Sequence, residues 1–299
     1  MNELLVILSS TYFLTVILLL HGLLKLKKCK CNSLYKVSVI VPARNEENNI
    51  DDCVKHLINQ DYPDFEIIIV NDRSEDRTEL FARKYSQKFD NIHLINIKDI
   101  PSEFSPKKFA IKSGIEASNG EIILTTDADC RPPKTWISSI TKHFDKKISL
   151  VIGFSPVLLK KNSSSILSGI LYIDSLSLAG VSAGSISLNF PLTCSGRNLA
   201  YRKNIFFEVH GFEGIEKAIS GDDDLLLHKI AKIEKFNIRY ATEKESRVPS
   251  FIDFNFSKFF SQRIRHASKF KLHPNRVKIF SAIIYLFNFA LIASFILYL

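Results

Sequence analysis

Apolar residues are concentrated at the two ends of the chain. Residues 4–24 and 279–299 contain no Asp, Glu, Lys or Arg. Because a helix needs about 20 apolar residues to cross the hydrocarbon core of a bilayer, each stretch is predicted to be a transmembrane helix rather than a buried core helix. The first stretch has no basic segment before it and no small-residue cleavage site after it, so we expect it to remain as an anchor.

Between the ends, short apolar runs alternate with segments of helical periodicity. Strands are predicted at residues 37–42, 65–70, 93–97 and 120–126, and helices at 50–59, 79–88 and 107–117. Strands that alternate with helices at such spacings predict βαβ units, and therefore an α/β fold with a mostly parallel sheet. The first strand is not followed by a glycine-rich turn, which argues against a dinucleotide-binding fold of the GxGxxG type.

The segment from residue 160 to residue 190 has a less regular pattern. Residues 166–178 are apolar with interspersed serines, and small residues follow from 179 to 187. Two structures fit this composition, a buried part of the core or a helix lying in the membrane plane beside a lipid acceptor. Of the two, we expect the core placement.

The positive charge of the chain lies next to the predicted spans. The formal net charge is +9, and its two clusters are Lys25, Lys27, Lys28 and Lys30 after the first span and Arg263, Arg265, Lys269, Lys271, Arg276 and Lys278 before the second. Basic residues beside spans favour the cytoplasmic side and contact with membrane lipids. We therefore predict a multi-pass protein of the cell membrane with two spans and a cytoplasmic domain at residues 36–270. Nucleic acid is not an expected partner, because the excess charge does not lie on a central motif.

The cysteines suggest no metal or disulfide framework. There are five of them, without C-x-x-C spacing. An odd number with this spacing indicates neither a set of disulfides nor a zinc site.

A pair of spaced aspartates follows the strand at 120–126. Asp127 and Asp129 can point the same way, because side chains alternate along an extended chain. Open α/β sheets bind ligands outside the carboxyl ends of their strands. A divalent cation such as Mg²⁺ typically takes one or two carboxylates together with substrate phosphates, so this pair is a candidate metal site. Two aspartates after a strand can also form a solvated turn.

A run of three aspartates precedes a predicted helix. Asp222, Asp223 and Asp224 follow Gly221, and acidic residues at a helix N-terminus are stabilising by about 0.3–1 kcal/mol each. Three in succession exceed what capping needs. Like charges this close raise the pKa of one carboxyl group, and a carboxylate with a raised pKa is a better general base for a hydroxyl group.

Taken together, the motifs resemble those of family 2 glycosyltransferases with the GT-A fold. Residues 37–50 (VSVIVPARNEENNI), 66–78 (EIIIVNDRSEDRT) and 125–129 (TTDAD) resemble the nucleotide-binding half, and residues 194–203 (CSGRNLAYRK), 220–230 (SGDDDLLLHKI) and 261–266 (SQRIRH) resemble the acceptor, catalytic and QxxRW segments. The resemblance covers about residues 36–266. It implies a donor half at 36–131 and an acceptor and catalytic half at 132–270.

The resemblance also implies roles for single residues. The donor-binding candidates are Pro42, Ala43, Asn45, Glu46, Asp72, Lys108, Asp127, Gln262 and Arg265. Among these, Asp72 matches the aspartate that accepts a hydrogen bond from uracil, and Lys108, beside Lys107, falls near the family's phosphate-side lysine. Two adjacent lysines are also common on a solvated face. Asp76 fits the role of a turn or cap residue better than Asp72 does.

The catalytic and acceptor-side candidates come from the same comparison. The family pattern Glu-Asp-x-Asp-Leu, aligned backwards from Asp224, places the catalytic aspartate at Asp222, whereas a gap of one residue selects Asp223. The acceptor-side candidates are Gly196, Arg197, Asn198 and His266, and this histidine stands where the family has tryptophan.

The expected function is that of a membrane-anchored, inverting transferase that uses a divalent cation, Mg²⁺ or Mn²⁺. Its expected donor is a nucleotide sugar, a UDP-sugar in particular, and its acceptor a hydroxyl group on a lipid-linked or cell-envelope glycan. A sugar nucleotidyltransferase is an alternative, but it would need a glycine-rich phosphate loop. A non-catalytic membrane scaffold is another, but it would have no need for Asp127, Asp129 and Asp222 together. The sequence does not indicate an oligomeric state.

Overall fold

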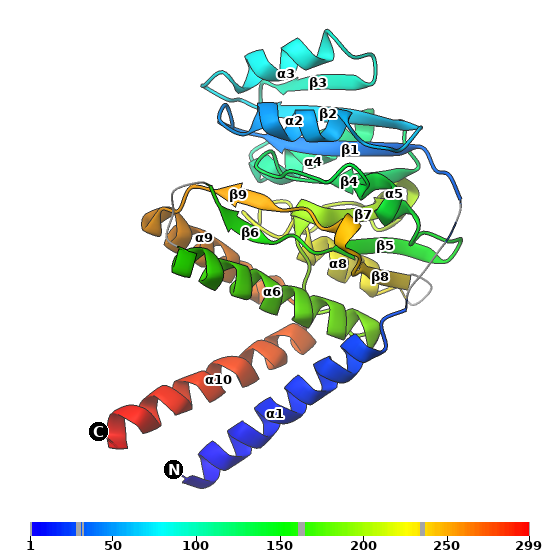
Figure 1. The fold of residues 1–299 in the computed structure, drawn as a ribbon. Helices are drawn as coiled ribbons and strands as arrows, with labels where there is room; N and C mark the ends of the chain where they lie inside the picture. Colours follow the sequence, from blue (N-terminus) through cyan, green and yellow to red (C-terminus); the bar gives the residue numbers. More distant parts are fainter. Residues whose placement is uncertain (1, 28–30, 32, 161–164, 234–236, 299) are drawn as a thin grey trace.

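An α/β domain stands on a stem of two helices (Figure 1). The computed structural model describes residues 2–27, 31, 33–160, 165–233 and 237–298. The stem consists of α1 (Asn2–Leu24) and α10 (Asn275–Tyr298), which match the two predicted terminal helices. Lys28 and Lys30 of the first basic cluster lie outside the described residues.

A seven-stranded sheet forms the centre of the domain. Its strands follow the order β3-β2-β1-β4-β7-β5-β8, and β7 is antiparallel to both of its neighbours while the other pairs are parallel. The strands are β1 (Val37–Ala43), β2 (Phe65–Asp72), β3 (Ile92–Ile97), β4 (Ile122–Thr125), β5 (Ile148–Gly153), β7 (Leu199–Arg202) and β8 (Asn237–Ala241). The mostly parallel α/β sheet that the sequence predicts is thus confirmed. A separate parallel pair is formed by β6 (Val157–Leu159) and β9 (Ser250–Ile252).

Helices cover both faces of the sheet and enclose two apolar cores. One face packs against α2 (Ile50–Ile58), α3 (Thr78–Ser86) and α5 (Trp136–Thr141). The other packs against α4 (Pro106–Ala117), α6 (Ser165–Ser187), α7 (Lys203–Glu208) and α8 (Asp224–Ala231). Because both faces are covered, β1, β2 and β4 read as continuous apolar runs, as buried parallel strands do. The helix α9 (Phe256–Ser268) and the short turn η3 (Phe270–Leu272) lead into α10.

The helix α6 is buried on one face only. Leu171, Ala183 and Ile186 pack toward the core, whereas Ile166 and Ile173 point outward and are 76% and 62% exposed. The expectation that this segment is part of the core therefore holds for its inner face and is wrong for its outer face. By length and composition α6 is also a third candidate for a membrane span, besides α1 and α10.

The stem joins the domain where α1 meets α6. A Cβ atom added at Gly22 would lie 2.2 Å from the carbonyl oxygen of Gly184, and one added at Gly184 would lie 2.5 Å from the carbonyl oxygen of Leu19. Only glycine allows two helix backbones to approach this closely. Within the stem, the rings of Tyr12 and Phe287 stack with their centroids 4.2 Å apart, which holds α1 against α10.

This contact predicts opposite effects for two glycines of the same helix. We expect Gly184→Ala to lower the stability of the protein by about 1–3 kcal/mol, because the new methyl group overpacks against the backbone of α1. Gly180→Ala is the matched control, since nothing lies within 4 Å of its added Cβ atom and alanine favours a helix by about 0.5–1 kcal/mol. Thermal unfolding of the purified protein in detergent measures both, and equal melting temperatures for the two variants would contradict the prediction.

Candidate active site

The loops after β1 and β2 are held together by hydrogen bonds at the carboxyl edge of the sheet. The backbone N–H groups of Asn45 and Glu46 donate to the hydroxyl oxygens of Ser74 and Thr78, at 3.0 and 2.7 Å. In return, the side-chain oxygen of Asn45 accepts a hydrogen bond of 2.9 Å from the backbone of Glu75. Asn45 has a φ of 54°, a left-handed conformation that asparagine tolerates better than most residues. The predicted first donor loop, which also includes Pro42 and Ala43, is therefore a rigid rim beside β2.

Asp72 lies buried at the end of β2, between two arginines. The Arg73 Nε atom donates to its Oδ1 atom at 3.0 Å, and Arg44 lies 3.9 Å from Oδ2. Asp76 instead caps the following turn, because it accepts hydrogen bonds from the backbone N–H groups of Thr78 and Glu47. The structure thus gives Asp76 the capping role. Asp72 lies at the carboxyl end of β2, and its role in base recognition stays a prediction.

Asp127 and Asp129 follow β4 at the same edge, and their surroundings concentrate negative charge. Burial raises the pKa of Asp129, and the charge of Asp127 raises it further. Burial also raises the pKa of Glu46 to about 7, with the charges of Asp129 and Asp127 adding to the effect. The Asp129 Oδ2 atom accepts a hydrogen bond of 2.9 Å from Ser250. A cation placed here would relieve the repulsion among these carboxylates, so the residues fit a divalent ion.

The protein alone supplies only part of a coordination shell. Within the described residues, no group of three or more His, Cys, Asp or Glu side chains has a geometry that could hold a metal ion. Mg²⁺ is commonly bound by one or two carboxylates plus substrate phosphates and water. The Asp127 and Asp129 pair supplies that share and leaves the remaining positions to a ligand.

Lys107 connects the two acidic segments of the site. Its ammonium group, from the first turn of α4, lies 2.8 Å from the Asp127 Oδ1 atom and 3.3 Å from the Asp222 Oδ2 atom. Burial would lower the pKa of Lys107, but the charges of Asp127 and Asp222 raise it well above its usual range, so the group stays protonated. The predicted donor half, which contains Asp127, and the predicted catalytic half, which contains Asp222, are thus joined by this ion pair.

Lys108, the predicted phosphate-side lysine, points away from this centre. Its side chain is fully buried, and its ammonium group donates to the carbonyl oxygens of Ala218 and Ser220. Lys108 therefore holds the loop that leads into the aspartate run, and Lys107 is the lysine that faces the aspartates. Adjacent residues of a helix are about 100° apart around its axis, so only one of the pair can face the site.

The three aspartates of the run have three different partners. Asp223 is the N-cap of α8: its Oδ1 atom accepts from the backbone of Asp224 at 2.7 Å, and its Oδ2 atom accepts from Gly196 at 3.0 Å. Asp224 pairs with Lys269, at 2.6 Å. Asp222 is left facing Lys107, and burial raises its pKa, which the charge of Lys107 opposes. This geometry favours Asp222 over Asp223 as a proton acceptor, although both remain predictions.

Lys269 is a partner of the aspartate run rather than an exposed basic residue. It follows α9, is only 5% exposed, and lies 3.8 Å from the Asp223 Oδ1 atom in addition to its contact with Asp224. The sequence places it in the basic cluster before the second span, so its role as a partner of the aspartate run was missed. No local pattern around Lys269 distinguishes it from the other basic residues of that cluster.

The acceptor-side candidates of the 196–198 segment differ in their surroundings. A Cβ atom added at Gly196 would lie 3.1 Å from the Asp222 Oδ2 atom, so glycine here permits the predicted close approach. The charge of Arg197 acts on Asp129 and lowers its pKa, against the larger effect of burial. Asn198 is buried. Its side-chain oxygen accepts a hydrogen bond from the Trp136 indole, and its side-chain nitrogen donates to the carbonyl oxygens of Phe154 and Ser246, at 2.7 to 3.0 Å. The Asn198 side chain therefore supports the surrounding loops from inside the domain and is not exposed to solvent.

The C-terminal motif lies on α9. Gln262, Arg265 and His266 are exposed, and His266 is close enough to Asp223 and Lys269 for their charges to act on it. Arg263 pairs with Asp174 of α6, at 2.5 Å, and so ties the two helices together. The contribution of Gln262 and Arg265 to donor binding remains a prediction.

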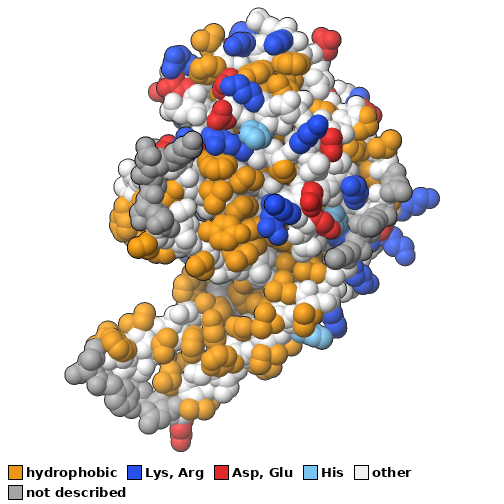
Figure 2. Space-filling model, viewed as in Figure 1, with side chains coloured by type: hydrophobic (Ala, Val, Ile, Leu, Met, Phe, Trp, Pro, Cys, Tyr) orange, Lys and Arg blue, Asp and Glu red, His pale blue; other side chains and the backbone are white. Residues whose placement is uncertain are grey.

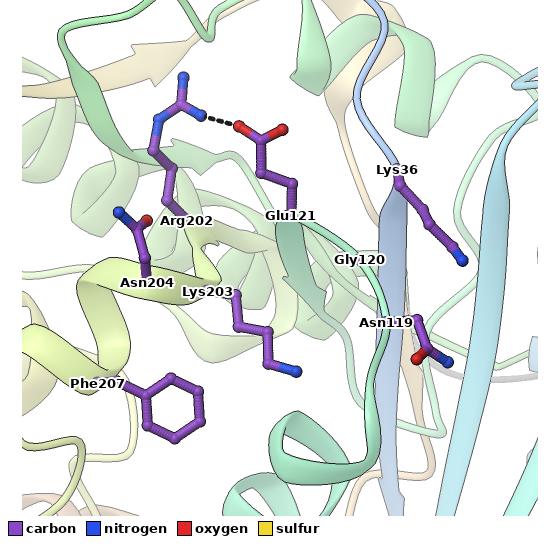
Figure 3. Close-up of a pocket in the computed structure, with 8 residues that line it drawn as sticks. All are labelled: Lys36, Asn119, Gly120, Glu121, Arg202, Lys203, Asn204 and Phe207. Atoms are coloured by element: carbon purple, nitrogen blue, oxygen red, sulfur yellow. Dashed lines mark hydrogen bonds and ion pairs between the residues drawn. The ribbon is translucent and has the colours of Figure 1, made fainter.

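A surface pocket lies at the other end of β4 (Figure 3). Its volume is about 620 Å³, and it is lined by Lys36, Asn119, Gly120, Glu121, Arg202, Lys203, Asn204 and Phe207. Glu121 pairs with Arg202, and Lys203 donates to the carbonyl oxygen of Ser118 at 2.6 Å. Because Asn119, Gly120 and Glu121 directly precede β4 whereas Asp127 follows it, the pocket is separate from the acidic site.

Comparison with known proteins identifies relatives of this chain. A family model described as Glycosyl transferase family 2 matches residues 38–220, which is more than half of the chain. The Probable glycosyltransferase YdaM of Bacillus subtilis is 32% identical over 199 residues, 65% of this chain and 46% of that protein. The Dolichyl-phosphate beta-glucosyltransferase of Mus musculus is 35% identical over 104 residues, 31% of either chain. The chain thus spans less than half the length of these relatives.

A solved structure extends the likeness to nearly the whole chain. The mannosyltransferase PcManGT from Pyrobaculum calidifontis, solved in complex with GDP-Man and Mn²⁺, superimposes with a TM-score of 0.63 over 89% of this chain and 72% of its own. Its sequence identity is 18%, so this likeness establishes the fold alone.

The different partners of Asp222 and Asp223 predict which of the two contributes more to the stability of the fold. We expect Asp223→Ala to lower the stability of the protein by about 0.5–2 kcal/mol, the usual cost of losing a helix N-cap. Asp222→Ala is the control and should change stability much less, because Lys107 keeps its shorter contact with Asp127, at 2.8 Å, and because burial penalises the charge that the substitution removes. Chemical denaturation in detergent compares the two variants, and the reverse order would show that Asp222, not Asp223, holds the loop.

Proposed function

Because this chain belongs to glycosyl transferase family 2, we propose that it transfers a sugar from a nucleotide sugar, a UDP-sugar in particular, to a hydroxyl group with inversion of configuration. One observation carries the proposal: a single ammonium group, that of Lys107, touches both Asp127 of the donor half and Asp222 of the catalytic half. A donor diphosphate held at Asp127 would then end within reach of a general base. This is the arrangement that a direct displacement requires.

Asp127 and Asp129 are proposed to hold a divalent cation, Mg²⁺ or Mn²⁺, against the donor diphosphate. When bound, the cation would neutralise charge on the departing diphosphate. The crowded carboxylates at this edge support the assignment, as does the Mn²⁺ in the solved structure of PcManGT. Lys107 is a second positive group on the same side, and Asp72 lies further along the edge, where a base would be recognised.

Asp222 is proposed to remove the proton from the acceptor hydroxyl group. The acceptor oxygen attacks the anomeric carbon, the bond from that carbon to the diphosphate oxygen breaks, and the proton passes to the Asp222 carboxylate. Burial raises the pKa of this carboxyl group and so makes it a stronger base. Asp223 is already engaged with two backbone N–H groups, which supports the choice of Asp222.

The acceptor is proposed to be lipid-linked or close to the membrane. The terminal helices α1 and α10 are long and apolar enough to anchor the chain, and the basic residues beside them favour a cytoplasmic position for the domain. A relative that acts on dolichyl phosphate, by its name, supports a lipid-linked acceptor. His266, in place of an aromatic platform, would hold a growing sugar chain weakly, so we propose the addition of one or a few sugars.

The proposal is tested by incubating the purified chain in detergent with a panel of UDP- and GDP-sugars and Mg²⁺ or Mn²⁺. We expect one donor to release its nucleoside diphosphate, because the site holds the donor between the cation and Lys107. Labelled donor supplied to native membranes should then give a short glycolipid on sizing. A long polymer would contradict the predicted short product, and no release with any donor would contradict the transferase assignment.

Donor binding and metal binding should be linked through Asp127 and Asp129. If the carboxylates and the diphosphate share one ion, Asp129→Ala should remove the increase in UDP affinity that Mn²⁺ gives to the unaltered protein. Calorimetric titration with UDP, with and without Mn²⁺, measures this increment. Asp90→Ala, at an exposed aspartate of the same half, is the control and should retain it. An increment that persists in Asp129→Ala would exclude the shared ion.

Replacement of the general base should separate turnover from binding. We expect Asp222→Asn to bind the donor almost normally and to transfer its sugar about 10² to 10⁴ times more slowly, the usual cost of losing a positioned base. Initial rates and donor affinity of the same preparation give the two quantities. A larger fall in turnover for Asp223→Asn would assign the base to Asp223 instead.

A further inference from the structure

The loop that carries Asp129 is bound along one side to the segment of β9. The backbone N–H group of Arg131 donates to the carbonyl oxygen of Pro249 at 2.9 Å, and the N–H group of Phe251 donates to the carbonyl oxygen of Asp129 at 3.1 Å. The Arg131 guanidinium group also lies over the Phe251 ring, 4.3 Å from its centroid. Two backbone hydrogen bonds and a cation–π contact therefore fix the path of this loop.

One side chain of β9 reaches the carboxylate of Asp129 itself. The Ser250 hydroxyl group donates to the Asp129 Oδ2 atom at 2.9 Å, and Ser250 is fully buried. On the other oxygen, the Cys130 thiol group donates to Oδ1 at 3.4 Å. An ionised carboxylate offers about four acceptor positions in all. Two donors, one on each oxygen, thus fix the plane of the carboxylate and leave an acceptor position on each oxygen for a cation.

We propose that Ser250 is a positioning residue for the divalent cation, because its hydroxyl group holds the Asp129 carboxylate in the orientation that binds the ion. The inference rests on the proposed function, since it takes Asp129 as a ligand of the cation. In this role Ser250 acts through Asp129 and not by contact with the ion. Ser250 also lies beyond residues 38–220, the part of the chain that the family model covers.

A carboxylate that is not held in place must be oriented at the moment when the ion binds. The terminal torsion of an aspartate side chain is broad, so an unheld carboxylate samples many orientations. Fixing one of them on binding costs affinity, and a hydrogen-bond donor that fixes it beforehand removes that cost. The effect is expected to be large at this site, because the protein supplies only Asp127 and Asp129 to the ion, and each carboxylate is a substantial share of the protein ligands.

The position of Ser250 is fixed by its own neighbours. Its backbone N–H group donates to the carbonyl oxygen of Pro156 at 2.9 Å, and Ser250 lies opposite Val157 in the parallel pair of β6 and β9. The N–H group of Val157 donates in turn to the Ser175 hydroxyl oxygen of α6, at 3.3 Å. This strand pair lies between the sheet and α6 (Figure 1). The hydroxyl group is therefore presented by a supported strand, which defines its position better than a loop would.

These contacts separate the support of the loop from the support of the carboxylate. The bonds of Arg131 and Phe251 to the loop use no atom of the Ser250 side chain, so they remain when that side chain is shortened. The hydrogen bond of the Ser250 hydroxyl group goes to the carboxylate of Asp129. Replacing Ser250 by alanine should therefore change the affinity for the cation while the path of the loop is kept.

Mn²⁺ binding to the full chain in detergent tests the inference. Detergent is required because hydrophobic side chains gather over the stem (Figure 2). Nucleotide affinity is measured with UDP, and in a separate series with GDP, in the presence and absence of Mn²⁺, and electron paramagnetic resonance measures the Mn²⁺ that stays free. We expect Ser250→Ala to bind Mn²⁺ about 10–100-fold more weakly beside the nucleotide, the usual cost of losing a hydrogen-bond partner of a metal ligand. Its affinity for the nucleotide without Mn²⁺ should be unchanged, because the loop keeps its backbone contacts.

Two further variants separate the hydroxyl group from the packing around it. Ser250→Thr retains a hydroxyl group on the same carbon atom and should keep the Mn²⁺ affinity of the unaltered protein. Ser155→Ala is the matched control, because it removes another buried hydroxyl group, one without a hydrogen-bond partner among the described residues. This variant should change neither the Mn²⁺ affinity nor the nucleotide affinity.

The metal dependence of turnover gives a second measurement. A loss of affinity is offset by a higher concentration of the ion, so excess Mn²⁺ should return the rate of donor turnover by Ser250→Ala to that of the unaltered protein. A rate that stays low at saturating Mn²⁺ would contradict a role in holding the cation ligand.

Several results would overturn the inference. Equal Mn²⁺ affinity in Ser250→Ala and in the unaltered protein would show that the hydroxyl group does not position the ligand. An equal loss in Ser250→Thr or Ser155→Ala would assign the effect to packing, and a matching loss of nucleotide affinity without Mn²⁺ would make Ser250 a residue of the fold alone. If the unaltered protein binds no Mn²⁺ with either nucleotide, the cation assignment of the proposed function is itself wrong and the positioning role falls with it. That result is distinct from the others, because it appears before any variant is compared.

Discussion

The ion pairs of Lys107 are the interaction on which the rest of the site depends. Its ammonium group lies between carboxylates that come from distant parts of the chain, Asp127 after β4 and Asp222 before α8. Without a positive group between them, two partly buried carboxylates would repel and the loops that carry them would separate. Lys107 therefore joins the loop after β4 to the loop before α8, in addition to the pairing of strands in the sheet.

A second lysine, Lys269, pairs with another aspartate of the same run. Lys269 enters from the membrane-side segment and neutralises Asp224, while Asp223 is used by the backbone of α8 and of Gly196. Three adjacent aspartates thus become three different groups, one paired with a lysine, one serving as a cap and one left facing the site. Environment rather than residue type decides which carboxylate can take a proton. Because Lys269 follows α9, the same contact links the aspartate run to the region next to the stem.

Strand pairing in the sheet also decides which of the apolar helices can cross a membrane. Within the part of the chain that the structure describes, three helices are apolar and long enough to span a bilayer, but the pairing of β5 with β7 prevents α6 from crossing. The close approach of Gly22 and Gly184 places α6 against the end of α1 instead. The fold is shared with PcManGT at 18% sequence identity, so most of the sequence can change while the fold is kept.

The sequence by itself determined the features that depend on near neighbours. Alternating apolar runs and amphipathic segments placed the first four strands and the helices between them, and the spacing of Asp127 and Asp129 placed both after a central strand. Tertiary structure alone decided which of Lys107 and Lys108 faces the site, since this depends on how α4 is rotated against the sheet. It also decided the partner of Lys269 and the placement of α6. Those choices rest on contacts between residues far apart in the chain, and no local pattern records such contacts.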